Sequence, residues 1–170
     1  MKRHRTAVLA VVAGLLLPLA GLAQPSAQDD LRQGLVALNQ NDLVHARELL
    51  ERAAKADPRS AVAWVALAQT YMKSGQKDMA VEAAGRAEEF GAEMPPVQHA
   101  LAMLYAGAGD MSKAAEWERR FAAAPGAGAQ TAASAAALSL EAGQAAEAVK
   151  WAEAAVRGAD QSRDAQRHAV

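Results

Sequence analysis

The residues that most often carry chemistry are few in this sequence and lie far apart. The chain has no cysteine, which excludes disulfides, thiolate metal sites and cysteine nucleophiles. No pair among the four histidines has the spacing of metal ligands, since they stand at His4, His45, His99 and His168. We therefore predict no metal site and no other cofactor.

Two further patterns resemble catalytic motifs without meeting their requirements. Glu88 and Glu89 lie near a predicted helix end with no apolar pocket around them, so we interpret them as solvated charges rather than an acid and a base. The run Pro125-Gly126-Ala127-Gly128 follows a predicted helix and lacks the lysine of a phosphate-binding loop. We predict that the chain is not an enzyme; a non-catalytic accessory subunit of an exported enzyme complex is the alternative.

The composition predicts one folded domain built from closely packed helices. Of the 170 residues, 52% are hydrophobic but only 4% are aromatic, and much of the apolar fraction is alanine. Alanine favours helices, and small side chains let helices approach closely. The net charge of −1 provides no basic field for nucleic acid, which is therefore not an expected partner.

Residues 1–23 have the pattern of a secretory signal peptide. Three positive residues within the first five precede the apolar run of residues 6–22, and Gly21-Leu22-Ala23 provides a small-residue exit. We predict cleavage after Ala23 and a periplasmic or secreted location. The alternative is an uncleaved membrane anchor, because a run of about 17 apolar residues is at the lower limit of a bilayer span. Cleavage would remove three of the 18 Lys and Arg residues and none of the 19 Asp and Glu residues, leaving a net charge near −4.

The rest of the chain repeats every 34 residues. Four blocks follow one another without a gap, at 27–60, 61–94, 95–128 and 129–162. A small residue recurs early in each block, at Gly34, Ala68, Ala102 and Ala136, and an alanine recurs twelve positions later, at Ala46, Ala80, Ala114 and Ala148. Small side chains at both offsets predict two helices in close contact within each block.

Between these two offsets each block has a residue that tolerates the left-handed backbone conformation. These residues are Asn41, Gly75, Gly109 and Gly143. Such a residue commonly ends a helix, so each block is predicted to form a helix, a tight turn and a second helix. Along the second helices, carboxylates precede basic residues by four positions, which predicts ion pairs on a solvated outer face. The predicted pairs are Glu48–Arg52, Glu51–Lys55, Glu82–Arg86, Glu116–Arg120 and Glu153–Arg157.

The period and the pattern resemble the tetratricopeptide repeat (TPR). The second block matches its signature best, with Trp64, Leu67, Ala68, Tyr71, Gly75, Ala80 and Ala87. The fourth block departs most, because Ala132, Ala135 and Ser139 stand where bulky residues are typical. The resemblance implies an all-α fold, an α-solenoid of four antiparallel helix pairs (a TPR superhelix) over residues 24–162. Residues 163–170 would then be a polar C-terminal tail.

In this family the first helix of each pair lines a concave surface that binds peptides or partner helices. The resemblance places nine partner-binding candidates there: Leu35, Leu38, Asn39, Val65, Gln69, Met72, Lys73, His99 and Met103. Most are apolar, and methionine adapts to varied ligands; packing between helices is the alternative for each. Leu31, Leu35 and Ala66 stand where a carboxylate-binding clamp needs polar groups, so no clamp is expected. The resemblance thus implies a protein-interaction scaffold or assembly adaptor in the cell envelope.

The C-terminal repeat raises two further expectations. Trp117 and Trp151 stand one period apart, and we interpret them as packing between neighbouring repeats, with an exposed partner contact as the alternative. Residues 161–170 are polar, so no capping helix is predicted over the apolar residues around Val149 and Val156. Repeat arrays need polar ends to stay soluble. This end is therefore expected to meet a partner or a second copy, which would make the chain a homodimer.

Overall fold

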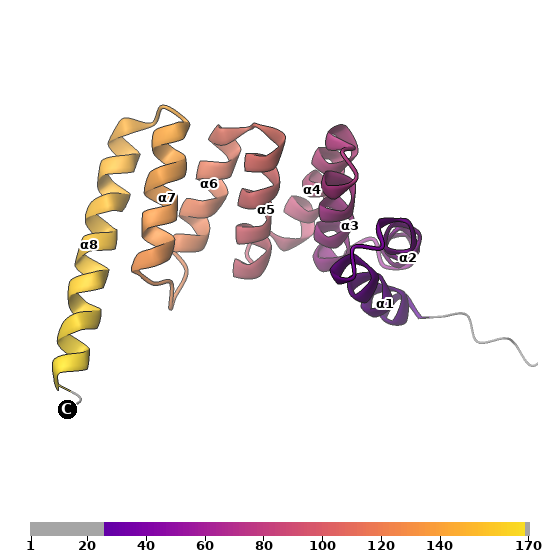
Figure 1. The fold of residues 1–170 in the computed structure, drawn as a ribbon, viewed down its shortest axis with the longest axis horizontal. Coiled ribbons are helices and arrows are strands. Elements are labelled where there is room, and N and C mark those ends of the chain that lie inside the picture. Colours follow the sequence, from indigo (N-terminus) through magenta and orange to yellow (C-terminus); the bar gives the residue numbers. More distant parts are fainter. Residues whose placement is uncertain (1–25, 169–170) are drawn as a thin grey trace, which may run out of the picture.

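The computed structural model describes residues 26–168, which form eight helices and no strand. The predicted signal peptide lies outside the described residues. The helix pairs follow one another in chain order along the long axis of the molecule (Figure 1). Their bounds are α1 (Ala27–Asn39), α2 (Leu43–Ala56), α3 (Ala61–Lys73), α4 (Lys77–Gly91), α5 (Pro95–Ala108), α6 (Met111–Ala122), α7 (Ala129–Glu141) and α8 (Ala145–His168).

The helices follow the 34-residue period of the sequence. The first helices of the four pairs begin at Ala27, Ala61, Pro95 and Ala129, which are the first residues of the four predicted blocks. The second helices begin at Leu43, Lys77, Met111 and Ala145, again 34 residues apart. The predicted all-α solenoid of four antiparallel helix pairs is confirmed.

The turn inside each pair contains the predicted left-handed residue. The φ angles are 60° at Asn41, 76° at Gly75, 94° at Gly109 and 74° at Gly143. In every turn the residue after the left-handed one donates its backbone N–H to a carbonyl one turn back in the first helix, as Gln76 does to Tyr71 at 2.9 Å. Because the same bond closes all four turns, the two helices of every pair leave the turn in the same geometry.

Small residues bring the two helices of each pair together, as the sequence predicts. Ala46, Ala80 and Ala114 are 0 to 1% exposed. The first repeat has glycine where later repeats have alanine, because Leu50 packs against it: a Cβ on Gly34 would lie 2.7 Å from Leu50 Cγ. Since no carbon can approach so closely, the large side chain on α2 requires the glycine on α1.

Three of the five predicted ion pairs are wrong. Glu116–Arg120 and Glu153–Arg157 form, at 2.8 and 3.6 Å. Arg52 instead binds Asp30 of α1, Glu51 lies 3.8 Å from Arg47, and Arg86 lies 3.4 Å from Glu89. Asp30 is a buried carboxylate, and burial of an unpaired charge is costly, so it takes the guanidinium in preference to the exposed Glu48.

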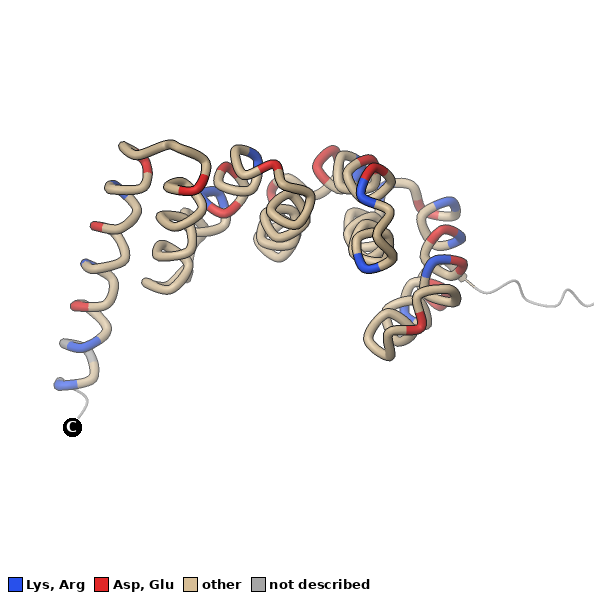
Figure 2. The backbone as a smooth tube through the Cα atoms, turned by 45° about the horizontal axis from the view of Figure 1, so that its top comes forward, with Lys and Arg blue, Asp and Glu red and all other residues tan. Residues whose placement is uncertain are grey.

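First helices pack against one another along the solenoid, α1 against α3 and α3 against α5, whereas successive second helices do not. The first helices therefore form the inner side of the arch seen in Figure 2. Few charges lie on the later three: α5 has none, α3 has only Lys73 and α7 has only Glu141, whereas α1 has Asp29, Asp30 and Arg32. Most charged residues lie on the second helices, as Figure 2 shows for the outer rim.

The fourth repeat is attached differently from the others. α7 packs against α6 but not against α5, so the contact between first helices stops after α5. The segment between α6 and α7, residues 123–128, is also longer than the segments between earlier repeats. Residues 163–168 of the predicted polar tail continue α8, which spans 24 residues whereas the other second helices span 12 to 15.

Candidate functional site

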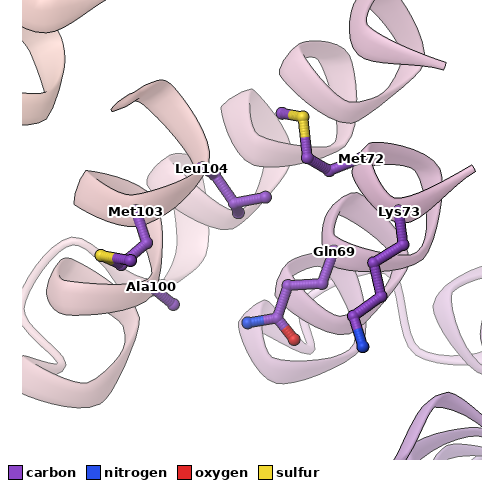
Figure 3. A pocket seen from close by; sticks show the side chains of 6 residues that line it. All are labelled: Gln69, Met72, Lys73, Ala100, Met103 and Leu104. Atoms are coloured by element: carbon purple, nitrogen blue, oxygen red, sulfur yellow. The ribbon is translucent and has the colours of Figure 1, made fainter. Parts of the chain in front are cut away.

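A hollow of about 340 Å³ opens on the inner side between α3 and α5. Gln69, Met72 and Lys73 line it from α3, and Ala100, Met103 and Leu104 line it from α5 (Figure 3). It lies where two first helices of successive repeats meet. The hollow is therefore a product of the repeat stacking and not of one helix pair.

Glycine and methionine shape the two walls of this hollow. Met72 packs over Gly107 of α5, where an added Cβ would lie 3.6 Å from the methionine sulfur. Met103 stands on the opposite wall and is 61% exposed, while Leu104 is buried. An exposed methionine is flexible and polarisable, so its position lets it adapt to the shape of a bound apolar group.

Lys73 supplies the only charge in the lining. It is exposed, and no carboxylate of residues 26–168 forms an ion pair with it. Gln69, one turn earlier on α3, adds an amide that both donates and accepts hydrogen bonds. The hollow thus combines an apolar surface with one cation and one amide on the same edge.

The hollow brings together four of the nine predicted candidates, namely Gln69, Met72, Lys73 and Met103. Sequence reasoning missed Ala100 and Leu104, although both fall within one turn of Met103 on α5. Their alanine and leucine side chains gave no signal, because the same residue types fill the core everywhere in this chain.

The other five candidates lie outside the hollow. Leu38 and Val65 belong to the core and are 5% and 9% exposed, so a bound segment could touch little of either. Leu35 is half-buried against the core, and Asn39 is exposed at the end of α1. His99 is held by its own neighbours: its Nδ1 lies 3.0 Å from Glu118, and its ring lies 4.8 Å from the ring of Phe121.

Polar contacts between repeats hold the walls of the hollow in place. The Tyr71 hydroxyl donates to Glu51 of the preceding repeat at 2.8 Å. Burial, followed by this carboxylate, raises the pKa of Tyr71 to about 12. The Trp117 indole likewise donates to Glu88 at 3.1 Å. Trp117 is 5% exposed, so it packs between neighbouring repeats as expected, and Trp151 is half-buried.

The part of the chain that the structure describes has no cluster of metal ligands and no helix suited to a membrane. Between Ser26 and His168, no three His, Asp or Glu residues gather closely enough to hold a metal ion. Over the same residues, none of the helices is both long and apolar enough to cross a bilayer.

Comparison with known proteins identifies the repeat. Residues 37–104 match the tetratricopeptide repeat family model. No curated protein sequence matches the chain significantly.

Several solved structures share the fold. A crystal structure of MamA has a TM-score of 0.68 at 20% identity and covers 82% of each chain. PilF of Pseudomonas aeruginosa has a TM-score of 0.64 at 19% identity, over 77% of this chain and 60% of that one. The Cut9 and Hcn1 hetero-tetramer has a TM-score of 0.60 at 18% identity, over 80% of this chain and 26% of that one. Together with the family match, these likenesses show that the helix pairs form a tetratricopeptide-repeat solenoid.

Proposed function

We propose that this tetratricopeptide-repeat solenoid is a protein-interaction scaffold that binds a peptide or partner helix in the hollow between α3 and α5. The observation that carries the proposal is the lining of that hollow. Two adaptable methionines, Met72 and Met103, face a surface without charge apart from Lys73. Such a surface fits an apolar side chain flanked by an acidic or polar group.

We further propose that the scaffold works in the cell envelope as an assembly or chaperone-like adaptor. The support for this location is the sequence of residues 1–23, with its positive start, apolar run and small-residue exit. The mass of the mature N-terminus tests it. A chain that begins at Gln24 supports an exported protein, and a chain that keeps Met1 and fractionates with membranes supports an anchored scaffold instead.

Site-specific photo-crosslinking in cells tests the binding site. A photoreactive residue at Met103 is expected to capture a partner, and Met72→Glu in the same chain is expected to abolish the capture by burying a carboxylate against the partner's apolar group. A photoreactive residue at Met79 is the matched control, because that methionine is 45% exposed but lies on α4. Capture that is equal at both positions, or that persists in the Met72→Glu variant, would contradict the proposed site.

A further inference from the structure

The fourth repeat ends in a face that earlier repeats cover. The second helices of the first three repeats pack against the first helix of the next repeat, as α2 does against α3, α4 against α5 and α6 against α7. One offset on these helices is occupied by Leu50, Ala84 and Glu118, which are 0, 0 and 2% exposed. The equivalent residue of the last repeat, Ala152, is exposed, and so is Val156 one turn later, at 61%. This apolar surface of α8 is not covered by any other helix of residues 26–168.

The same face continues over both helices of the last pair. Val149 of α8 is 59% exposed, and a shallow apolar hollow runs along α8 past it to Arg157. Leu140 of α7 is 66% exposed, although the equivalent Met72 packs over α5. We call these exposed apolar residues of the last helix pair the end face: Leu140 on α7, and Val149, Ala152 and Val156 along the hollow on α8.

The opposite end of the solenoid is polar. α1 has Asp29, Arg32 and Gln33 at offsets where α3 buries Ala63, Ala66 and Leu67 at 0 to 3% exposure. Asp29 and Arg32 also form an ion pair at 3.5 Å. Head-to-tail stacking would bury these charges against the end face, and that burial is costly. The end face is therefore better matched to its own equivalent than to the start of a second solenoid.

The charges beside the end face are arranged symmetrically. Lys150, Glu153, Arg157 and Asp160 follow one stripe of α8, next to the apolar stripe of Val149, Ala152 and Val156. Two antiparallel copies of α8 related by a two-fold axis at position 155 would bring these charges together in opposite pairs. Lys150 would then face Asp160 of the second copy, and Glu153 would face Arg157, each pair occurring twice.

This register also suits the apolar residues. A two-fold axis at the level of residue 155 places Val156 of one copy within one turn of its own equivalent, with Ala152 one turn earlier on the same exposed stripe. The small side chain of Ala152 leaves room for the valines to interdigitate. α8 is also long enough for the contact, because Gly158 already lies against the first residue of α7 and the helix extends beyond it (Figure 1).

We propose that two copies of this chain associate through the end face, with the α8 helices antiparallel about a two-fold axis near Ala155. The observation that selects a second copy as the occupant is the self-complementary charge stripe from Lys150 to Asp160. This surface is separate from the hollow between α3 and α5. The dimer proposal and the partner-binding proposal can therefore be tested independently.

Charge exchange at two distant positions tests the register. Lys150 and Asp160 are ten residues apart on α8, about 15 Å, so they do not contact each other within one chain. Lys150→Glu alone and Asp160→Lys alone each turn two attractive contacts of the dimer into repulsive ones. We expect the dimer dissociation constant of each variant to rise about tenfold or more, as measured by analytical ultracentrifugation of the full chain at low salt.

Mixing the two variants should restore association. In the mixed dimer the carboxylate introduced at position 150 of one chain faces the ammonium introduced at position 160 of the other. The native Asp160 of the first chain likewise faces the native Lys150 of the second, so both pairs are attractive again. A change in folding of either variant could not produce this rescue, and circular dichroism of each variant confirms its helix content. Failure of the mixture to recover the dimer, or a wild-type chain that stays monomeric at the highest concentration reached, would overturn the proposal.

Cross-linking locates the interface directly. The native chain has no cysteine, so single-cysteine variants report one position each. Val156→Cys is expected to give a covalent dimer with a short bis-maleimide, because the two valines lie within a turn of each other. Val44→Cys is the matched control, since Val44 is 60% exposed but lies on α2. Equal cross-linking at both positions would place the contact elsewhere and overturn the proposal.

Discussion

At the scale of single residues, the two buried carboxylates of residues 26–168 each join one helix to another. Asp30 is 5% exposed and accepts from Arg52 Nε at 3.0 Å, and this carboxylate raises the pKa of Arg52. Glu118 is 2% exposed and faces His99. A core made largely of alanine offers little shape specificity, because alanines are alike in size. Buried polar pairs, by contrast, have one satisfied arrangement, so they help to fix which helices meet and in which register.

The two tyrosines of the chain provide a pH test of this burial. The pKa of Tyr71 is raised to about 12, by burial first and then by Glu51, and burial raises the pKa of Tyr105 as well. The tyrosine pKa in the unfolded chain is about 10. Because the folded pKa is the higher one, the stabilising contribution of Tyr71 is complete below pH 10 and is lost as the pH rises through 12.

We therefore expect the free energy of unfolding to fall between about pH 10 and 12, with a slope of up to about 1.4 kcal/mol per pH unit from Tyr71 alone. Urea unfolding at a series of alkaline pH values measures this slope, and Tyr71→Phe should reduce it. Tyrosinate absorbance gives an independent measurement in the folded chain. Its appearance near pH 10 for both tyrosines would contradict the prediction.

At the scale of helices and turns, the sequence predicts more than it does for single contacts. The period of 34 placed the start of all four first helices, and the residues that tolerate a left-handed backbone marked all four turns, because both signals are local. The pairs Asp30–Arg52 and His99–Glu118 were missed, because their members lie 22 and 19 residues apart on helices whose rotation is set by packing. The lining of the hollow was predicted only in part for the same reason. The sequence shows which residue types lie on the first helices, but the rotation that buries Leu38 and Val65 depends on packing between helices.

Two glycines provide a matched test of the prediction that the turns require a residue with a left-handed backbone. Gly85 lies within α4 and Gly109 ends α5, and a Cβ added to either would meet nothing within 4 Å. The two positions differ in backbone conformation, because Gly109 has a left-handed φ of 94° whereas Gly85 is helical. Gly85→Ala should raise the free energy of unfolding by about 0.5–1 kcal/mol through helix propensity. Gly109→Ala should lower it by about 1–2 kcal/mol, because alanine is strained in the left-handed region.

Chemical denaturation of the two variants measures both effects, with circular dichroism of each to confirm the helix content. The prediction is that the two substitutions change the free energy of unfolding in opposite directions. A shift in the same direction for both variants would mean that the turn after α5 does not require a left-handed residue.

At the scale of the whole molecule, the four repeats are unequally joined. The fourth repeat has Ser139 at the offset where Tyr71 and Tyr105 stand in the second and third repeats. Arg119 stands at the offset of Glu51 and donates to Ser139 at 3.3 Å. The contact between Tyr71 and Glu51 thus returns in the last repeat with its direction reversed: the long side chain now comes from the preceding second helix. This exchange explains how a block that lacks the bulky residues of the family still packs on its neighbour.

Arg119 is therefore expected to couple the last repeat to the rest of the solenoid. It also donates to Gln144 at 2.5 Å and lies 4.0 Å from Glu147, so one side chain contacts both helices of the fourth pair. No packing of α7 on α5 supplements it. Arg119→Ala should lower the free energy of opening α7 and α8 by about 1–3 kcal/mol, because Ser139 is buried and would lose its partner.

Native-state hydrogen exchange measures this opening helix by helix. Exchange in α7 and α8 should accelerate by about tenfold or more in Arg119→Ala, while α3 and α4 keep their protection. Arg120→Ala is the matched control, since the neighbouring arginine pairs with Glu116 on its own helix and stacks on Trp117 within its own repeat. The measurement belongs at protein concentrations low enough to exclude association through the end face, which would protect α8 by itself. Equal acceleration in both variants, or acceleration spread over all eight helices, would show that the fourth repeat does not open as a separate unit and that Arg119 is not its link to the solenoid.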